Sequence, residues 1–196
     1  MQNKPIFTGV QQAARGKLSA QPEVGHRHVF GLDWTRGDSP TTVVVIDAST
    51  GQMVDIERFH FGGWGEHRKR IQYMYTLWNP FLIIADKNAI GAPNVEALQA
   101  EGLPVHGVAL TTKLVGHMAA ALAIAIEDGR LALSPYPPLL NQLAEARFAE
   151  PEASQIPHHY PRIVMPEGME IDLLTATAMA WWGIKYYNPS GVISFV

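Results

Sequence analysis

The chain has 196 residues and a formal net charge of −3, with 47% hydrophobic and 17% charged residues. This length suits one domain with a sizeable core, and the composition is that of a globular protein rather than a disordered one. Because the sequence has no cysteine, disulfides, cysteine-ligated zinc and a thiol nucleophile are excluded. The negative net charge argues against a protein that binds nucleic acid through a high overall positive charge.

Residues 1–28 have no sustained hydrophobic period and are interpreted as a tail or linker before one domain at 29–196. Runs of β-branched and apolar residues predict strands at 29–34, 41–48, 53–61, 81–85, 105–110 and 160–165. Helical spacing predicts helices at 64–78, 93–101, 111–128, 136–149 and 170–187. A β-hairpin followed by alternating strands and helices favours an α/β domain with a mixed sheet flanked by helices.

Three classes of protein are disfavoured by features that this sequence lacks. No apolar run approaches the about 20 residues of a membrane span, so no membrane association is expected. No G-x-x-x-x-G-K-[ST] loop for nucleotide phosphates and no G-x-S-x-G nucleophile motif occur. An ATPase of that loop type and a serine hydrolase are therefore not expected.

Acidic side chains stand where carboxylates are unfavourable. Asp33 lies in the first apolar strand, Asp86 directly follows the run F-L-I-I-A, and Asp172 comes after Glu170 near the start of the last apolar helix. Burying an unpaired carboxylate is costly, and three that converge at one end of a sheet would repel each other. Divalent cations relieve such repulsion, and two ions about 3.5–4 Å apart can hydrolyse a phosphodiester.

Each acid also has a purely structural explanation. Asp33 can cap a turn at the end of a strand, and Asp86 can begin a loop. Asp172 and Glu170 suit the first turn of a helix, where the helix dipole favours negative charge. The joint placement of these acids at element boundaries is what favours a single site.

The order of these motifs, from about residue 29 to 183, resembles the nuclease domain of phage terminase large subunits. The segments that carry the resemblance are G-L-D-W around Asp33, I-I-A-D before a loop with Gly91, T-T-K ending at Lys113, and E-I-D ending at Asp172. The similarity implies a ribonuclease-H-like fold, with a mixed sheet flanked by helices. It also implies a metal-dependent endonuclease that cuts double-stranded DNA during phage genome packaging.

The acid cluster before the last helix departs from the family's pattern. The family has a His-Asp-Asp-like cluster there, whereas this chain has Glu170 and Ile171 before Asp172. The resemblance implies Asp33, Asp86 and Asp172 as catalytic metal ligands, with Glu170 as an extra or substitute ligand. It implies Mg²⁺ or Mn²⁺ as the cofactor, in the form of two ions, and the departure leaves the number of ions open.

Basic residues near these acids are candidates for DNA contacts. Lys113 stands at the start of a helix, where the dipole disfavours a cation, and this favours contact with a phosphate. Arg36 and Lys87 lie close to the proposed acids in sequence and can position a phosphate or tune the acids by charge.

The resemblance further implies partners and a location. The family works with an ATPase motor domain, which this chain does not contain, and with a terminase small subunit and a portal protein, in the cytoplasm of a bacterial host. Two alternatives stay open: another ribonuclease-H-like nuclease such as a Holliday-junction resolvase, and a catalytically degenerate module that docks onto the packaging machine. Ile171 in the acid cluster is the feature that keeps the second alternative open.

Overall fold

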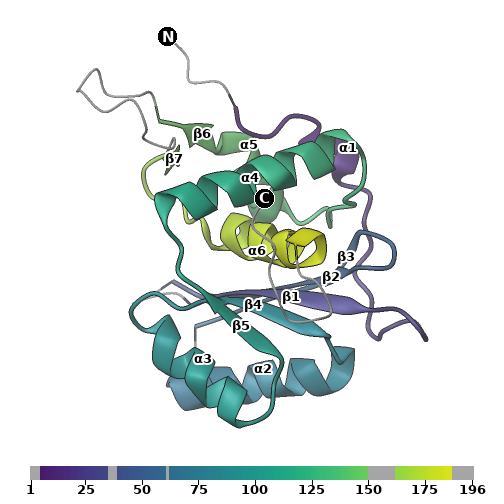
Figure 1. Ribbon diagram of the computed structural model, residues 1–196. Helices are drawn as coiled ribbons and strands as arrows, with labels where there is room; N and C mark the ends of the chain where they lie inside the picture. The colour runs from purple at the N-terminus through teal and green to yellow at the C-terminus, as the bar shows by residue number, and fades with distance from the viewer. Residues whose placement is uncertain (1–4, 35–38, 61, 150–161, 187–196) are drawn as a thin grey trace.

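A five-stranded mixed sheet lies between layers of helices in the computed structural model (Figure 1). The structure describes residues 5–34, 39–60, 62–149 and 162–186. The strands of this sheet are β1 (His28–Asp33), β2 (Thr41–Asp47), β3 (Gln52–Phe59), β4 (Leu82–Asp86) and β5 (Val105–Val108). Their order is β3-β2-β1-β4-β5, which places β1 at the centre.

The pairing of the strands determines which strand ends lie side by side in the sheet. β1 pairs antiparallel with β2, and β2 pairs antiparallel with β3. β4 runs parallel to both of its neighbours, β1 and β5. A parallel pair needs a crossover connection, and helix α3 provides it between β4 and β5. The carboxyl ends of β1 and β4 therefore lie side by side.

Helices cover both faces of the sheet (Figure 1). One face is covered by α2 (Trp64–Trp78) and α3 (Gly91–Ala100), and the other by α6 (Asp172–Tyr186) with α4 (Thr112–Glu127), α5 (Pro137–Glu145) and the short α1 (Val10–Ala13) behind it. Alternate residues of β1 serve the two sides: Phe30 and Leu32 pack in the α2 and α3 core, and Val29 in the α6 core.

Helix α6 approaches β1 at backbone distance. A Cβ placed on Gly31 would lie 1.8 Å from the carbonyl oxygen of Ala176 and 2.7 Å from the amide nitrogen of Ala180. Only glycine fits this crossing, because any side chain would push the helix off the sheet. This close contact fixes the distance between α6 and the sheet. It therefore also fixes the position of Asp172, which lies in the first turn of α6.

The N-terminal segment lies against the domain instead of running free of it. Ile6, Phe7 and Val10 are buried in the core, and the amide of Ile6 donates to the carbonyl of Ala146 at 3.1 Å. These apolar residues are too few to form a visible period, which is why the sequence indicates a tail there. The domain boundary predicted after this segment stays a prediction.

The region after α5 differs from the prediction. The helix expected at 136–149 ends at Glu145, because Arg147 and Phe148 form strand β6 (Arg147–Phe148). This strand pairs antiparallel with β7 (Ile163–Val164) in a separate two-stranded ribbon. The strand expected at 160–165 is therefore shorter where it is described, and it does not extend the main sheet.

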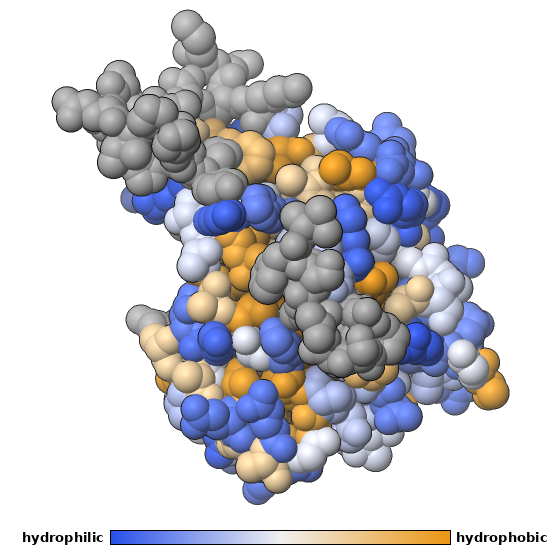
Figure 2. Space-filling model, in the orientation of Figure 1, coloured by the Kyte–Doolittle hydropathy of each residue, from blue (hydrophilic) through white to orange (hydrophobic). Residues whose placement is uncertain are grey.

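The predicted fold class is confirmed: the sheet is mixed and helices flank it. In the orientation of Figure 1, the surface is mostly hydrophilic with separate hydrophobic patches (Figure 2). None of the described helices is long and apolar enough to cross a membrane.

Replacing Gly31 with alanine is expected to destabilise the protein by about 2–3 kcal/mol, as overpacking of a tight contact does. The reason is the clash of the new Cβ with the Ala176 carbonyl. Urea unfolding measures the change. Gly65→Ala is the matched control, since Gly65 lies in α2 with nothing closer than the Arg68 guanidinium at 3.9 Å, and it should be neutral or stabilising. Equal stability of the two variants would contradict the close approach of α6.

Candidate active site

A row of polar side chains crosses the sheet at one end. Asp33 on β1 is paired with Thr42 on β2, and Thr42 is paired with Arg58 on β3. On the other side, Asp86 follows Ala85, the partner of Leu32, so it lies beside Asp33 at the carboxyl end of β4. Because residues in register share a face of the sheet, the row faces the α6 layer.

Asp33 is a buried carboxylate in this row and lies close to other acids. Its residue is 9% exposed. Burial, followed by the charges of Asp86 and then Asp172, raises the pKa of the Asp33 carboxyl well above its usual range. The carboxylates that the sequence predicted as one group therefore influence each other electrostatically.

Asp86 ends β4 and begins a tight loop. Its Oδ1 accepts a hydrogen bond from the amide of Asn88 at 2.8 Å, and the Asn88 side chain donates to the carbonyl of Leu110 at 3.1 Å. A Cβ on Gly91 would lie 2.1 Å from the carbonyl oxygen of Asp86, so the glycine predicted to follow this acid allows the loop to fold back on it.

Asp172 is almost completely buried and tied to its surroundings. Its Oδ2 accepts from Thr42 Oγ1 and, at 2.9 Å, from Arg58 Nε. Its Oδ1 accepts from Gln142 Nε2 at 2.9 Å and from Arg58 Nη2 at 3.1 Å. Glu170 also accepts a hydrogen bond from Arg58 Nη2. Burial opposes the charge of the Arg58 guanidinium, but Asp172 and the hydrogen bonds outweigh that effect and raise its pKa.

The fit of this site to a metal ion differs between the acids. Asp33 and Asp86 are adjacent carboxylates whose mutual repulsion a divalent cation would relieve, and oxygen ligands suit Mg²⁺. Asp172 directs both of its oxygens at protein donors instead. Accordingly, within the described part of the chain, no group of three or more His, Asp or Glu side chains is arranged to hold a metal ion.

The basic candidates lie around this end of the sheet. Lys87 is exposed and directly follows Asp86, with its amide bonded to the carbonyl of Val108 at 2.9 Å. Lys113 is exposed in the first turn of α4, after the N-cap Thr111. Arg36 lies outside the described residues.

Sequence reasoning missed Arg58, Thr42 and Gln142. An arginine near the end of a strand and a glutamine in a helix are typical of solvated surfaces, so neither has a local signal. Gln142 is nevertheless buried, since its Nε2 donates to Asp172 and its Oε1 accepts from the amide of Leu174 at 3.0 Å. The one signal available in the sequence for Thr42 was a hydroxyl beside the apolar run V-V-V-I of β2.

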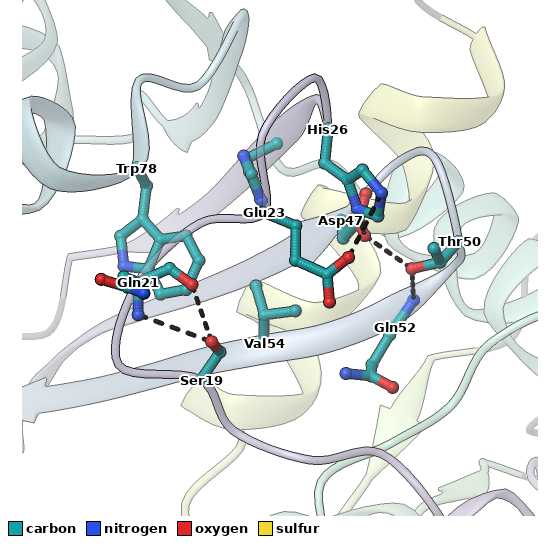
Figure 3. Close-up of a pocket in the computed structure, with 10 residues that line it drawn as sticks. Ser19, Gln21, Glu23, His26, Asp47, Thr50, Gln52, Val54 and Trp78 are labelled. Atoms are coloured by element: carbon teal, nitrogen blue, oxygen red, sulfur yellow. Dashed lines mark hydrogen bonds and ion pairs between the residues drawn. The ribbon is translucent and has the colours of Figure 1, made fainter.

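Figure 3 shows a polar pocket of about 100 Å³. It lies at the opposite end of β1 and β2 from the row, since His28 pairs with Asp47 there. Asp47 lines it and accepts from His26 Nδ1 at 2.7 Å, from the amide of Ser49 at 2.8 Å and from Thr50 Oγ1 at 2.7 Å. Burial opposes the charge of Asp47, but these hydrogen bonds outweigh it and lower its pKa. The cluster holds the N-terminal segment onto the β2–β3 hairpin.

Comparison with known proteins finds a relative in sequence. No family model matches the chain. The large terminase subunit of Thermus virus P23-45 is 24% identical over 128 residues, which are 63% of this chain and 26% of that protein. The chain thus spans about a quarter of the length of the curated relative that it matches.

Solved structures match a larger share of the chain. The large terminase nuclease of thermophilic phage G20c has a TM-score of 0.79 at 17% identity, covering 92% of this chain and 98% of that one. The same nuclease with bound magnesium gives 0.78 at 18% identity, covering 92% and 97%.

The chain therefore has the fold of these solved structures, which is the ribonuclease-H-like fold that was predicted. More particularly, the chain resembles the nuclease domain of phage terminase large subunits, which the order of its sequence motifs also indicated.

Asp33→Asn is expected to raise the free energy of unfolding of the metal-free protein at pH 7 by about 1–2 kcal/mol. The folded pKa of Asp33 is raised, so its ionisation opposes folding, and asparagine removes that cost. The gain should shrink as the pH falls through the folded pKa towards the ordinary aspartate range. Urea unfolding in EDTA measures it. Asp128→Asn, at an exposed carboxylate paired with Arg130, is the control, and a destabilised Asp33→Asn protein would refute the repulsion.

Asp47→Asn is expected to lower the free energy of unfolding at pH 7 by about 1.5–3 kcal/mol, since it weakens hydrogen bonds to a buried charge. The folded pKa of Asp47 is lowered, so the lost stability is fully present above the unfolded pKa. The difference from the wild type should therefore narrow as the pH falls from the ordinary aspartate range through the lowered value. Thr50→Val keeps the carboxylate and should cost less. A difference that does not change with pH would contradict the account.

Proposed function

We propose that this chain is a divalent-metal-dependent endonuclease domain that cuts double-stranded DNA during the packaging of a phage genome. The observation that carries the proposal is the placement of Asp33 beside Asp86 at the carboxyl ends of adjacent parallel strands, with its pKa raised by burial and by the charges around it. Paired carboxylates under such strain are typical of functional sites. The likeness to metal-containing terminase nuclease structures supports the same function.

The residues that would hold Mg²⁺ or Mn²⁺ are Asp33 and Asp86, together with Asp172 once its oxygens are available, and Glu170 as an additional ligand. When bound, the ions supply the activation of water and the stabilisation of the leaving oxygen in phosphodiester hydrolysis. Before the ions bind, the carboxylates give the site a negative charge. The same carboxylates would hold the bound ions in position at one end of the sheet.

The chain's own cations would position the DNA. Lys87 is exposed next to Asp86, and Lys113 is exposed at the start of α4, where the helix dipole favours a bound anion such as a phosphate. Both side chains suit contact with backbone phosphates, which set the position of a duplex without reading its sequence. Arg36, near Asp33 in sequence, is assigned the same role. The net charge of −3 predicts weak and salt-sensitive DNA binding by the chain alone.

In the setting of genome packaging, the domain would act with an ATPase motor domain, a terminase small subunit and a portal protein in the cytoplasm of a bacterial host. These partners follow from the likeness to a terminase large subunit and belong to the proposal.

A second candidate is a catalytically degenerate docking module of the packaging machine. The observation that favours it is the engagement of Asp172 by Arg58, Thr42 and Gln142, which leaves this acid occupied by protein donors. The two candidates differ in metal dependence, because a docking module would neither bind divalent ions at these acids nor cut DNA.

Incubation of supercoiled plasmid with the chain and Mn²⁺ or Mg²⁺ is expected to give linear or degraded DNA, and EDTA should prevent this. Asp86→Asn should lower the rate by at least about a hundredfold, since it removes a ligand of the ions. Asp128→Asn, at the exposed end of α4, should cut at the wild-type rate. Gel electrophoresis over time measures all three.

The outcomes separate the candidates. Absence of cutting by the wild type in any metal, or equal cutting by Asp86→Asn, would remove the nuclease proposal and favour the docking module. Faster cutting of a four-way junction than of linear duplex would assign the domain to the resolvase class instead.

A further inference from the structure

Arg58 occupies the position in the active-site row that faces Asp172. Its strand β3 is the outer strand of the sheet, and its pairing with Thr42 brings it into the row that continues to Asp33. The side chain reaches Asp172 in the first turn of α6. The exposed fraction of the Arg58 side chain is 21%, and that of Asp172 is 1%, so the ion pair between them is largely shielded from water.

The hydrogen bonds of Asp172 are complete without a metal ion. A carboxylate has about four lone-pair positions, and Asp172 receives donors at four: two from Arg58, one from Thr42 and one from Gln142. The bidentate contact with Arg58 fixes the plane of the carboxylate. Gln142 is itself fixed by the Leu174 amide, so the arrangement is built and not incidental.

The guanidinium also supplies the charge compensation that a cation would supply. It contacts Asp172 and Glu170 together. Glu170 is the more exposed partner, with 39% of its side chain exposed. Arg58 can keep its ion pair with Glu170 when it releases Asp172. A positive charge this close to Asp172 opposes the approach of a second cation.

We propose that Arg58 competes with divalent metal for Asp172, so that metal binding at this acid requires the guanidinium to break its hydrogen bonds with Asp172. Arg58 is then a positioning residue that holds the site in a low-affinity form, with the ion favoured first at Asp33 and Asp86. The inference deepens the proposed metal-dependent function and rests on it for the identity of the competing cation.

The test is isothermal titration of the full chain with Mn²⁺. Arg58→Gln should bind Mn²⁺ about tenfold more tightly than the wild type, since it removes an opposing charge next to the acid. Arg58→Lys keeps the charge but loses the bidentate contact, so it should show a smaller gain. Arg70→Gln is the matched control, because Arg70 makes a similar two-point contact with Glu57 on the far side of the sheet, and its affinity should equal that of the wild type.

Circular dichroism and thermal unfolding without metal establish that each variant is folded, and if Arg58→Gln is not, Arg58→Lys alone decides. Unchanged or weaker Mn²⁺ binding by folded Arg58 variants would overturn the competition. Plasmid cutting by the wild type separates this failure from that of the proposed function: cutting with no affinity change removes the role of Arg58 and leaves the nuclease. If the wild type does not cut DNA but Arg58→Gln still binds Mn²⁺ more tightly, the competition between Arg58 and metal is supported and the nuclease function is not.

Discussion

The close approach of helix α6 to strand β1 is the constraint on which the rest of the structure depends. It requires Gly31, because the backbone of Ala176 occupies the space that a side chain would need. The helix in turn covers β1, β2 and β4 and carries the apolar core on that side of the sheet. The distance between the first turn of α6 and the sheet is thereby fixed. At this distance Asp172 lies within hydrogen-bonding reach of Thr42 on β2.

The charges at this end of the sheet are a consequence of that geometry. Packing places one carboxylate of the helix over a row in which two others already end adjacent strands. The protein offsets part of the repulsion from within, through the guanidinium of β3. Asp33 remains strained, because burial, followed by the charges of Asp86 and Asp172, raises the pKa of its carboxyl. The site is therefore asymmetric: one acid is satisfied by the fold and another is strained by it.

Local signals in the sequence were sufficient for most elements and for the strained acids. The helix at 64–78 was predicted with the bounds observed, because the glycines before it and Asn79-Pro80 after it mark both ends locally. Asp33 and Asp86 stood out because a carboxylate in or directly after an apolar strand is anomalous without any knowledge of its neighbours. The end of α5 was missed because it depends on pairing between Arg147 and Val164, which are distant in sequence. Arg58 was missed for the same reason, since only its contact with Asp172 distinguishes it from a surface arginine.

The position of α6 in the chain has a consequence for how the protein is made. Thr42 and Asp172 are 130 residues apart in sequence, and α6 is the last of the described elements to leave the ribosome. Until then the sheet has one face without its central helix, so the apolar side of β1, β2 and β4 is exposed to aggregation. The same delay means that a nascent chain has Asp33 and Asp86 in place before the third acid arrives. Assembly of the complete acid group therefore waits for α6, and the long sequence separation between Thr42 and Asp172 predicts slow folding.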